Sequence, residues 1–348
     1  MEIDFQPFTV RKQVPLAIAR GTSAGNTNLW LCLRADGYEG WGEATPFSLV
    51  RGISPSLAKL EAQCERLRSR LTGIHPLERQ RIEGILNQAA VDASVRAAVD
   101  MALHDWLGKR VGLPLWQLWG LDRDRIVPTS VTIGISSPEA ACERVQRWRE
   151  VLDVQVLKVK LGSPAGLAAD REMLTAVQSE APAAEISVDA NGGWSLTEAI
   201  AMAEWLAARG VRHLEQPLAA GQEADLLELS ARSPLPIFAD ESCHHSQDIL
   251  KLADRVQGVN LKIMKTGGLS AVQHAIHTAR AAGLQVMFGC YSDSALANTA
   301  MAQLAPLADY LDLDSHLNLR DDPFVGATLV NGRLQPNEQP GLGVTRCA

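Results

Sequence analysis

The segment VQVLKVK (residues 154–160) is a short apolar run that ends on a lysine, and the segment EISVD (residues 185–189) ends on an acid. Six similar runs lie before and after them, and stretches with helical spacing of apolar residues separate most of the runs. The eight runs are Val127–Ile133, Val154–Lys160, Glu185–Asp189, Val211–Glu215, Pro236–Asp240, Val256–Lys262, Leu284–Gly289 and Tyr310–Asp314. Eight alternating strand and helix units favour the α/β class and a closed parallel (β/α)8 barrel. The pattern alone leaves an open doubly wound sheet possible, although no glycine-rich dinucleotide turn follows the first run.

The residues before the barrel have a different pattern. Residues 2–45 alternate and turn in the manner of an antiparallel meander, whereas residues 55–120 carry apolar residues at helical spacing. We therefore predict an N-terminal α+β capping domain over residues 1–122 and a catalytic barrel over residues 123–324. The tail, residues 325–348, is too polar for another unit and is predicted to return to the capping domain.

Composition restricts the class of protein. The 348 residues are 46% hydrophobic and 21% charged, with a net charge of −7, which is typical of a globular protein that acts on small molecules. No basic run indicates nucleic-acid binding, and no apolar stretch is long enough to cross a membrane. The six cysteines are scattered and form no CxxC pair, so they are predicted to be free thiols of a cytoplasmic protein.

Charged residues stand where the predicted strands end. Asp189, Glu215 and Asp240 end three consecutive strands, and the C-terminal strand ends of a barrel form its active-site edge. Three carboxylates that converge there would repel one another unless a cation lay between them. An all-oxygen ligand set is typical of Mg²⁺, with Mn²⁺ as the alternative.

Two lysines are predicted to face each other across the same edge. Lys160 ends the second strand and Lys262 ends the sixth, and these strands are opposite in an eight-stranded barrel. Lys158 is two residues before Lys160, so both can point inward. Two nearby ammonium groups with a metal ion beside them lower each other's pKa, and a lysine with a lowered pKa can act as a general base. The spacing therefore predicts proton removal on one face of a carbon and proton return on the other.

Five motifs then show a resemblance to a known family. They are LKVKLG (157–162), VDANGGW (188–194), LEQP (214–217), ADES (239–242) and NLKIMKTGGL (260–269), preceded by WGEATP (41–46). The chain resembles the muconate-lactonizing subgroup of the enolase superfamily. The resemblance implies Asp189, Glu215 and Asp240 as Mg²⁺ ligands, Lys160 and Lys262 as the acid/base pair, and Lys158 as a supporting cation.

The end of the eighth strand narrows the reaction. Asp312 and Asp314 would attract a substrate ammonium group, and the motif is similar to the DxD of dipeptide epimerases. We therefore predict epimerisation of a dipeptide at the α-carbon of its C-terminal residue. Arg20, Thr132 and Asp293 are further candidates for substrate contact.

Several alternatives remain at this point. o-Succinylbenzoate synthase and N-acylamino acid racemase share both lysines, and a muconate-type cycloisomerase belongs to the same subgroup. An alternative of another class is a barrel that binds a ligand without catalysis. Relatives commonly assemble, so we also expect a homo-oligomer, with no nucleic-acid or membrane partner.

Overall fold

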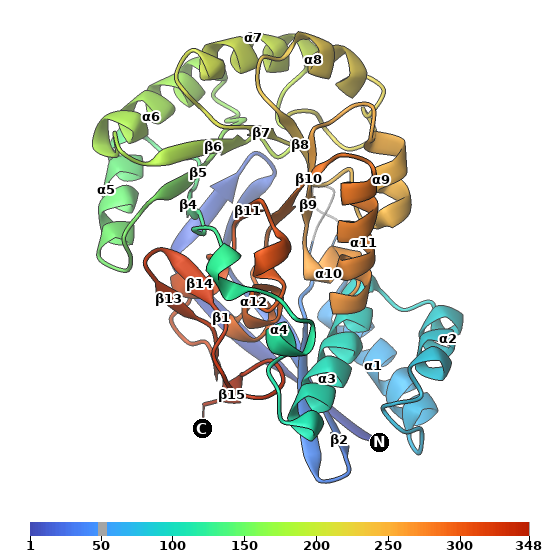
Figure 1. The fold of residues 1–348 in the computed structure, drawn as a ribbon. Coiled ribbons are helices and arrows are strands. Elements are labelled where there is room, and N and C mark those ends of the chain that lie inside the picture. The colour runs from blue at the N-terminus through green and yellow to red at the C-terminus, as the bar shows by residue number, and fades with distance from the viewer. Residues whose placement is uncertain (48–53, 348) are drawn as a thin grey trace.

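The computed structural model describes residues 1–47 and 54–347. Figure 1 shows a long antiparallel hairpin and its helices beside a larger body, in which a ring of helices surrounds short strands. Both ends of the chain lie on the side of the hairpin. Among the described residues, no helix is both long and apolar enough to cross a membrane.

The N-terminal part is a meander covered by helices. Its strands β1 (Glu2–Ile18), β2 (Gly21–Ala35) and β3 (Tyr38–Ala44) pair in sequence order and antiparallel. Three helices follow, α1 (Leu57–Leu71), α2 (Arg79–Ala89) and α3 (Ala93–Val111). Helix α3 packs closely on β3, since a Cβ atom on Gly42 would collide with the carbonyl oxygen of Ala98. This agrees with the predicted strands followed by helices.

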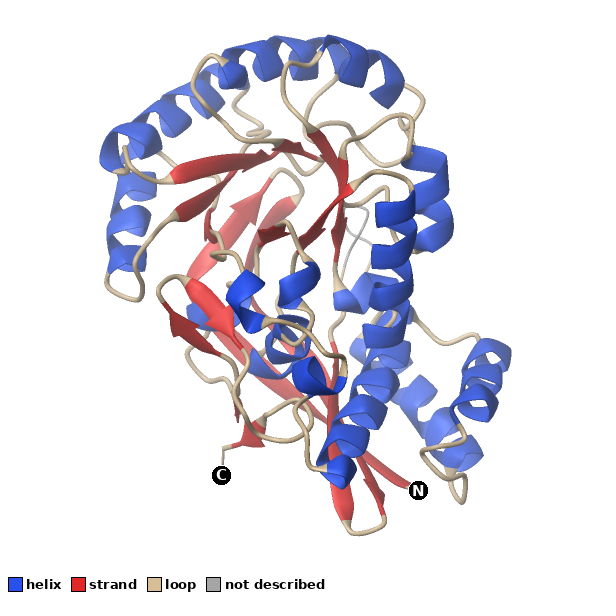
Figure 2. Cartoon of the chain, in the orientation of Figure 1, coloured by secondary structure: helices blue, strands red, loops and turns tan. Residues whose placement is uncertain are grey.

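Eight parallel strands form the larger body (Figure 2). They are β4 (Val131–Ile133), β5 (Val156–Lys160), β6 (Glu185–Asp189), β7 (Leu214–Glu215), β8 (Ile237–Ala239), β9 (Gly258–Leu261), β10 (Gln285–Phe288) and β11 (Tyr310–Leu311). Each pairs with the next in the chain, and a parallel bridge between Thr129 and Leu311 closes the first strand onto the last. The prediction of a closed (β/α)8 barrel is therefore confirmed, and an open doubly wound sheet is excluded.

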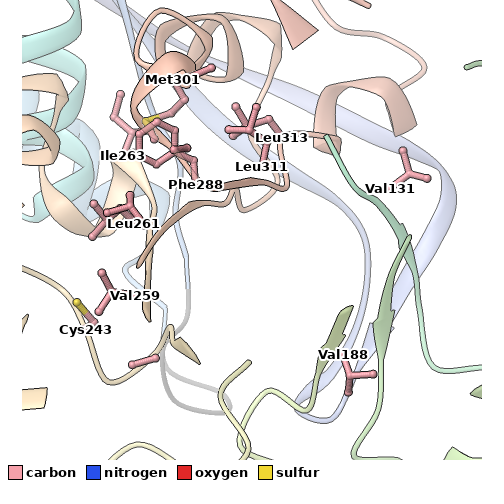
Figure 3. Close-up of a cluster of buried hydrophobic side chains, with 14 of the residues drawn as sticks. Val131, Val188, Cys243, Val259, Leu261, Ile263, Phe288, Met301, Leu311 and Leu313 are labelled. Atoms are coloured by element: carbon pink, nitrogen blue, oxygen red, sulfur yellow. The ribbon is translucent and has the colours of Figure 1, made fainter. Parts of the chain in front are cut away.

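Helices connect the strands and cover the barrel. They are α5 (Pro138–Arg149), α6 (Leu167–Glu180), α7 (Leu196–Ala207), α8 (Leu226–Arg232), α9 (Ser246–Leu252), α10 (Ile263–Thr266), α11 (Leu269–Ala281) and α12 (Ala295–Ala302), with the short α4 (Leu115–Leu118) preceding the barrel. Figure 3 shows part of the buried apolar cluster, including Val131, Val188 and Leu261 from three different strands. Because side chains alternate along a strand, the residues between these apolar positions face the barrel interior.

Three rings fill the interior near the N-terminal ends of the strands. His213 packs on Phe238 and Tyr310 with ring centroids 4.5 and 4.6 Å apart. Gly258 makes room for this cluster, because a Cβ atom there would overlap the ring of Phe238. A cavity of about 170 Å³ lies beside this cluster and is lined in part by His213 and Tyr310, whereas the buried ion pairs of the barrel lie toward the C-terminal ends of the strands.

The tail contacts both bodies. Strand β15 (Thr345–Arg346) pairs with β12 (Phe324–Val325), and the guanidinium of Arg346 lies 4.7 Å from the ring centroid of Trp30 in the meander. The hairpin of β13 (Thr328–Val330) and β14 (Arg333–Gln335) lies instead at the barrel, where the carbonyl of Gly332 accepts a hydrogen bond from the N–H of Thr129 at 2.9 Å. The boundaries after residues 122 and 324 stay predictions.

Candidate active site

Three carboxylates meet inside the barrel at the C-terminal ends of its strands. Asp189 pairs in register with Lys160 on one side and with Glu215 on the other. Asp189, Glu215 and Asp240 are fully buried, and each offers an oxygen atom within 4.8 Å of the others. The convergence expected from the strand order is therefore present.

The protein compensates these charges unevenly. Burial raises the pKa of Glu215 to about 7, and the neighbouring charge of Asp189 adds to this effect. Burial acts on Asp189 in the same direction, but Lys160 and Lys158 outweigh it and hold the pKa of Asp189 at about 2. Glu215 is thus the carboxylate whose charge the protein alone supports least.

The carboxylates fit a magnesium ion. Oε2 of Glu215 is buried and accepts no hydrogen bond from the described residues, although it lies 2.7 Å from Nζ of Lys158. All the oxygens come from carboxylates, which are ligands that Mg²⁺ prefers and zinc does not require. Asn260 fixes the other Glu215 oxygen with a hydrogen bond of 2.7 Å.

The two predicted acid/base lysines lie on different sides of the carboxylates. Nζ of Lys160 is 2.6 Å from Oδ2 of Asp189, and Nζ of Lys262 is 2.6 Å from Oδ2 of Asp240. Both side chains line one cavity of about 340 Å³. A substrate held in that cavity would therefore meet an amine from β5 and another from the end of β9.

Lys158 lies deeper than Lys160 and pairs with several acids. Its Nζ is 2.7 Å from carboxylate oxygens of both Glu215 and Asp312, and the side chain is 1% exposed. Burial alone would lower its pKa, but Asp312, Glu215 and Asp189 raise it well above the ordinary value. Among the protein groups alone, the acids around Lys158 outweigh the neighbouring lysine. The lowering expected with a metal ion beside the lysines stays a prediction.

Lys262 shows the same balance. Burial opposes its charge, yet the nearby carboxylate of Asp240 raises the pKa of Lys262 above its ordinary value. The protein groups alone therefore do not give Lys262 the lowered pKa that is expected of a general base.

Lys265 is a buried lysine whose role the sequence did not assign. Its Nζ is 2.6 Å from Oδ1 of Asp240 and also donates to the carbonyl oxygen of the same residue. It belongs to the motif NLKIMKTGGL, and its side chain is fully buried. The short helix α10 turns it back toward the end of β8, which spacing alone does not reveal.

The two aspartates after β11 have different partners. Asp312 pairs with Lys158 and accepts a hydrogen bond of 3.0 Å from Ser130. Asp314 accepts the backbone N–H of Thr132 at 2.7 Å. Burial and the charge of Asp312 raise the pKa of Asp314 to about 6, which the bonds from Thr132 oppose. The pair therefore offers one acid that is already neutralised by a lysine and one that is not.

Two neighbouring cavities share the catalytic edge. The smaller, of about 150 Å³, reaches Thr132, Asp314 and Lys160, and the larger reaches Lys160 and Lys262. Strand β1 contributes to both, chiefly through Lys12 and Leu16. Lys160 thus lies where the cavities meet, and the first strand of the chain forms a wall common to both.

The remaining predicted contacts fall in different places. Arg20 lines the larger cavity, with a guanidinium nitrogen 2.7 Å from Oε1 of Glu241. Thr132 lines the smaller cavity. Asp293 is buried, lines neither cavity and accepts the backbone N–H of Tyr291 at 3.0 Å.

Tyr291 and Lys12 were missed as site residues. The ring centroid of Tyr291 is 4.6 Å from Nζ of Lys262, and the ring stacks on Phe47 from the capping domain. Nζ of Lys12 donates to Ser23 and Ser292 at 3.0 and 2.7 Å and so joins the meander to the barrel. Neither residue belongs to one of the motifs found in the sequence.

Comparisons with known proteins agree with this geometry. The family model for the enolase C-terminal domain-like fold matches residues 140–347, and that for the mandelate racemase / muconate lactonizing enzyme N-terminal domain matches residues 3–120. A hydrophobic dipeptide epimerase from Flavobacteria bacterium (strain MS024-2A) is 44% identical over 99% of this chain and 97% of that protein.

Two solved structures share the whole architecture. One is the substrate-liganded L-Ala-D/L-Glu epimerase of Bacillus subtilis, with a TM-score of 0.93, 27% identity and full coverage of both chains. The other is a dipeptide epimerase of Enterococcus faecalis V583 complexed with Mg and L-Leu-L-Tyr, with a TM-score of 0.91 and 26% identity over 99% of each chain. The chain belongs to the mandelate racemase / muconate lactonizing enzyme family, which has an enolase-like C-terminal domain.

Proposed function

We propose that the protein is an Mg²⁺-dependent isomerase that epimerises a dipeptide at the α-carbon of its C-terminal residue. The observation that carries this proposal is the pair Lys160 and Lys262, which line one cavity from two sides of a buried carboxylate triad. The names of the relatives support the same activity.

Asp189, Glu215 and Asp240 are the proposed metal ligands. Bound Mg²⁺ would supply positive charge that stabilises the negative charge developing on the substrate carboxylate. Lys158 and Lys265, both fully buried, lie beside Glu215 and Asp240 and keep these carboxylates in position. The chain thus holds three acids together in a dry interior, where they would otherwise repel one another.

The lysines carry the proton transfers. An uncharged lysine on one side removes the α-proton, which leaves an enediolate, and the ammonium group of the other lysine returns a proton from the opposite side. The carbon is inverted, and each lysine ends in the protonation state in which the other began. The same residues work in the reverse direction with their roles exchanged, as an epimerisation requires.

Asp314 is the proposed partner of the dipeptide's free ammonium group. Asp312 already pairs with Lys158, so a second cation would gain less from it. Asp314 has no lysine or arginine within ion-pair distance among the described residues and lines the smaller cavity beside Lys160. An N-acylated amino acid carries no ammonium group, which favours free dipeptides over the substrates of an N-acylamino acid racemase.

Arg20, Thr132 and Asp293 have supporting roles in this proposal. Arg20, which forms an ion pair with Glu241, is part of the wall around the side chain of the C-terminal residue. Thr132 holds Asp314 through its backbone N–H, and Asp293 holds the backbone of Tyr291 beside Lys262. Of these three residues, only Arg20 and Thr132 are therefore expected to touch the substrate.

The test is α-proton exchange in D₂O, followed by mass spectrometry over a library of dipeptides and their N-acetylated forms. We expect deuterium at the C-terminal residue of free dipeptides, dependent on added Mg²⁺ and abolished by EDTA. Exchange confined to N-acetylated compounds would assign the protein to the racemases instead. An absence of exchange in every compound would leave the non-catalytic barrel as the better description.

Two further predictions concern the whole protein. We retain a homo-oligomeric assembly and a cytoplasmic location as expectations, supported by the family resemblance and by the free state of all six cysteines. Light scattering coupled to gel filtration measures the assembly directly.

A further inference from the structure

The smaller cavity has a composition of its own. Asp314 lines it, whereas Lys262 lines only the larger cavity, so a dipeptide bound as proposed above places its N-terminal residue in the smaller one. Apolar side chains form much of its wall, among them Leu16, Ile135 and Trp148. This wall also includes an arginine that the proposed mechanism does not use.

Arg144 is that arginine, and it comes from the outer face of the barrel. It lies on α5, and its guanidinium stacks on the indole of Trp148 with 4.0 Å between the guanidinium carbon and the ring centroid. Within residues 1–47 and 54–347, it forms no hydrogen bond and no ion pair closer than 4.0 Å. Stacking on a buried ring fixes the plane of a guanidinium and leaves its edge N–H groups available as donors.

The surroundings partly desolvate this cation. Burial lowers the pKa of Arg144 to about 10, and the charge of Asp314 opposes that effect. An arginine with part of its hydration removed and no protein carboxylate within ion-pair distance gains from a ligand that supplies one.

The other charges around the smaller cavity also favour a negatively charged ligand. Asp312 is neutralised by Lys158, and Lys160 by Asp189. Among the described residues that line this cavity, Asp314 then faces both Arg144 and Lys12, whose Nζ donates to hydroxyl groups of Ser23 and Ser292. The charge of Asp293 also acts on Lys12, but Asp293 does not line the cavity. Addition of the substrate's ammonium group would raise the excess of positive charge further, and a negative charge on the same residue of the substrate would offset it.

We infer that the smaller cavity selects dipeptides whose N-terminal residue is acidic, with Arg144 as the specificity-determining residue that binds the side-chain carboxylate. The inference rests on the proposed epimerase function and specifies its substrate class. Leu16 and Ile135 contact the methylene carbons of that side chain, and Arg144 forms a two-pronged contact with its carboxylate. The ammonium group of the same residue pairs with Asp314, so the two charges of the substrate residue meet opposite charges at two places.

The experiment compares pairs of nearly isosteric substrates in the Mg²⁺-loaded enzyme. Exchange in D₂O is measured for Glu-Leu against Gln-Leu and for Asp-Leu against Asn-Leu, and each ratio of kcat/KM is taken as the acid preference. We expect a preference of about 10- to 100-fold, the size of a charge-assisted hydrogen bond between a ligand and a partly buried cation. Leu-Leu should also be a poorer substrate than Glu-Leu.

Two substitutions on the same helix separate a direct contact from a general charge effect. Arg144→Met retains much of the packing on Trp148 and removes the charge, and it should reduce the acid preference to about 1- to 3-fold with little loss for Gln-Leu. Arg147→Met removes the same charge from an exposed position on α5 and should leave the preference unchanged. Arg144→Lys should restore part of the preference, because the charge returns without the planar fork.

The outcomes keep this inference apart from the function on which it rests. Exchange of Gln-Leu or Leu-Leu at rates equal to Glu-Leu would overturn the acid specificity and leave the epimerase proposal intact. An acid preference that survives Arg144→Met would overturn the role of this residue. A lack of exchange in all free dipeptides would overturn the proposed function itself.

Discussion

The two ends of the barrel interior are built from the same eight strands but differ in the side chains that they bury. At the N-terminal ends, His213, Phe238 and Tyr310 pack ring against ring, and Gly258 leaves the space they need. At the C-terminal ends, four buried lysines lie against buried carboxylates at 2.6 to 2.7 Å. One end gains stability from apolar burial, and the other holds charges that are costly to bury.

Substitutions at the N-terminal ends should therefore affect folding, and substitutions at the C-terminal ends should affect chemistry. A ring removed from the N-terminal end leaves a cavity in a packed interior. A charge removed from the C-terminal end leaves its partner uncompensated and changes what the site can bind. Both effects can be measured on one protein, and they should separate.

The largest expected effect is on proton transfer. Lys160→Ala and Lys262→Ala should each lower the rate of epimerisation by at least 10²- to 10⁴-fold, the usual contribution of a positioned acid or base. Because the lysines lie on different sides of the carboxylates, each variant should retain exchange mainly with one of the two epimers. Separate assays of the L,L and L,D forms in D₂O measure this.

A matched control for the lysine variants is Lys251→Ala, which removes an exposed lysine from α9 and should retain normal rates. If both catalytic variants exchanged both epimers as fast as the unaltered protein, the assignment of the acid/base pair would be wrong.

Next in size is the loss of a ring at the opposite end. Phe238→Ala should reduce the free energy of unfolding by about 3–5 kcal/mol, because a fully buried ring leaves a cavity that surrounding residues fill only in part. Chemical denaturation measures the loss, and Leu250→Ala on exposed α9 should stay within about 0.5 kcal/mol of the unaltered protein. Exchange activity below the unfolding transition should persist, and its disappearance there would contradict the separation of the two ends.

Asp314→Asn should have a smaller effect that is confined to binding. The substitution retains the shape of the side chain and removes the proposed partner of the substrate ammonium. We expect KM for a free dipeptide to rise about 10- to 100-fold, with kcat changed less, which corresponds to the loss of a hydrogen bond to a charged group. Steady-state kinetics test this, and an unchanged KM would exclude Asp314 as the ammonium site.

The last effect concerns pH and the contact between the capping domain and the barrel. Glu43 of β3 is fully buried and accepts bonds from Ser294 and Asn28, and burial raises its pKa to about 8, helped by the charge of Asp293. The folded protein therefore retains a proton on Glu43 that the unfolded chain releases near pH 4.5. The stability that this group contributes should be present below pH 4.5 and be lost as the pH rises toward 8.

Glu43→Gln should flatten this decline, because the amide cannot lose a proton. Denaturation curves of both proteins between pH 5 and 8.5 measure the difference in slope, which can reach about 1.4 kcal/mol per pH unit for one proton. Equal slopes would show that Glu43 releases no proton over this range. Phe238→Ala should leave the slope unchanged, since it removes no titratable group.

Much of the fold and the centre of the site could be predicted from the sequence. The C-terminal ends of the parallel strands in a barrel lie at one edge. Asp189, Glu215 and Asp240, which stand at such ends, could therefore be placed together from the order of the strands alone. The two lysines followed by the same argument. These predictions depend on local patterns and on one rule of topology.

Other features depend on contacts between segments that are distant in the sequence, and no local pattern predicts them. Lys12 and Arg144 stand on a strand and a helix that have ordinary amphipathic spacing, yet both reach the cavity. The burial of Lys265 depends on the turn of α10, which could not be inferred. The pKa of Lys158 among the protein groups alone could not be inferred either, because the sum of its neighbouring charges depends on distances that a sequence does not contain.

The hairpin of β13 and β14 has a consequence for how the protein is made. The first barrel strand is synthesised roughly two hundred residues before Gly332, whose carbonyl group accepts a hydrogen bond from Thr129 beside that strand. While the chain is still being elongated, the seam between the first and last strands therefore lacks its final cover. The ribosome must release most of the molecule before this cover can form, and a message truncated by only a short distance would yield a nearly complete chain whose seam is uncovered.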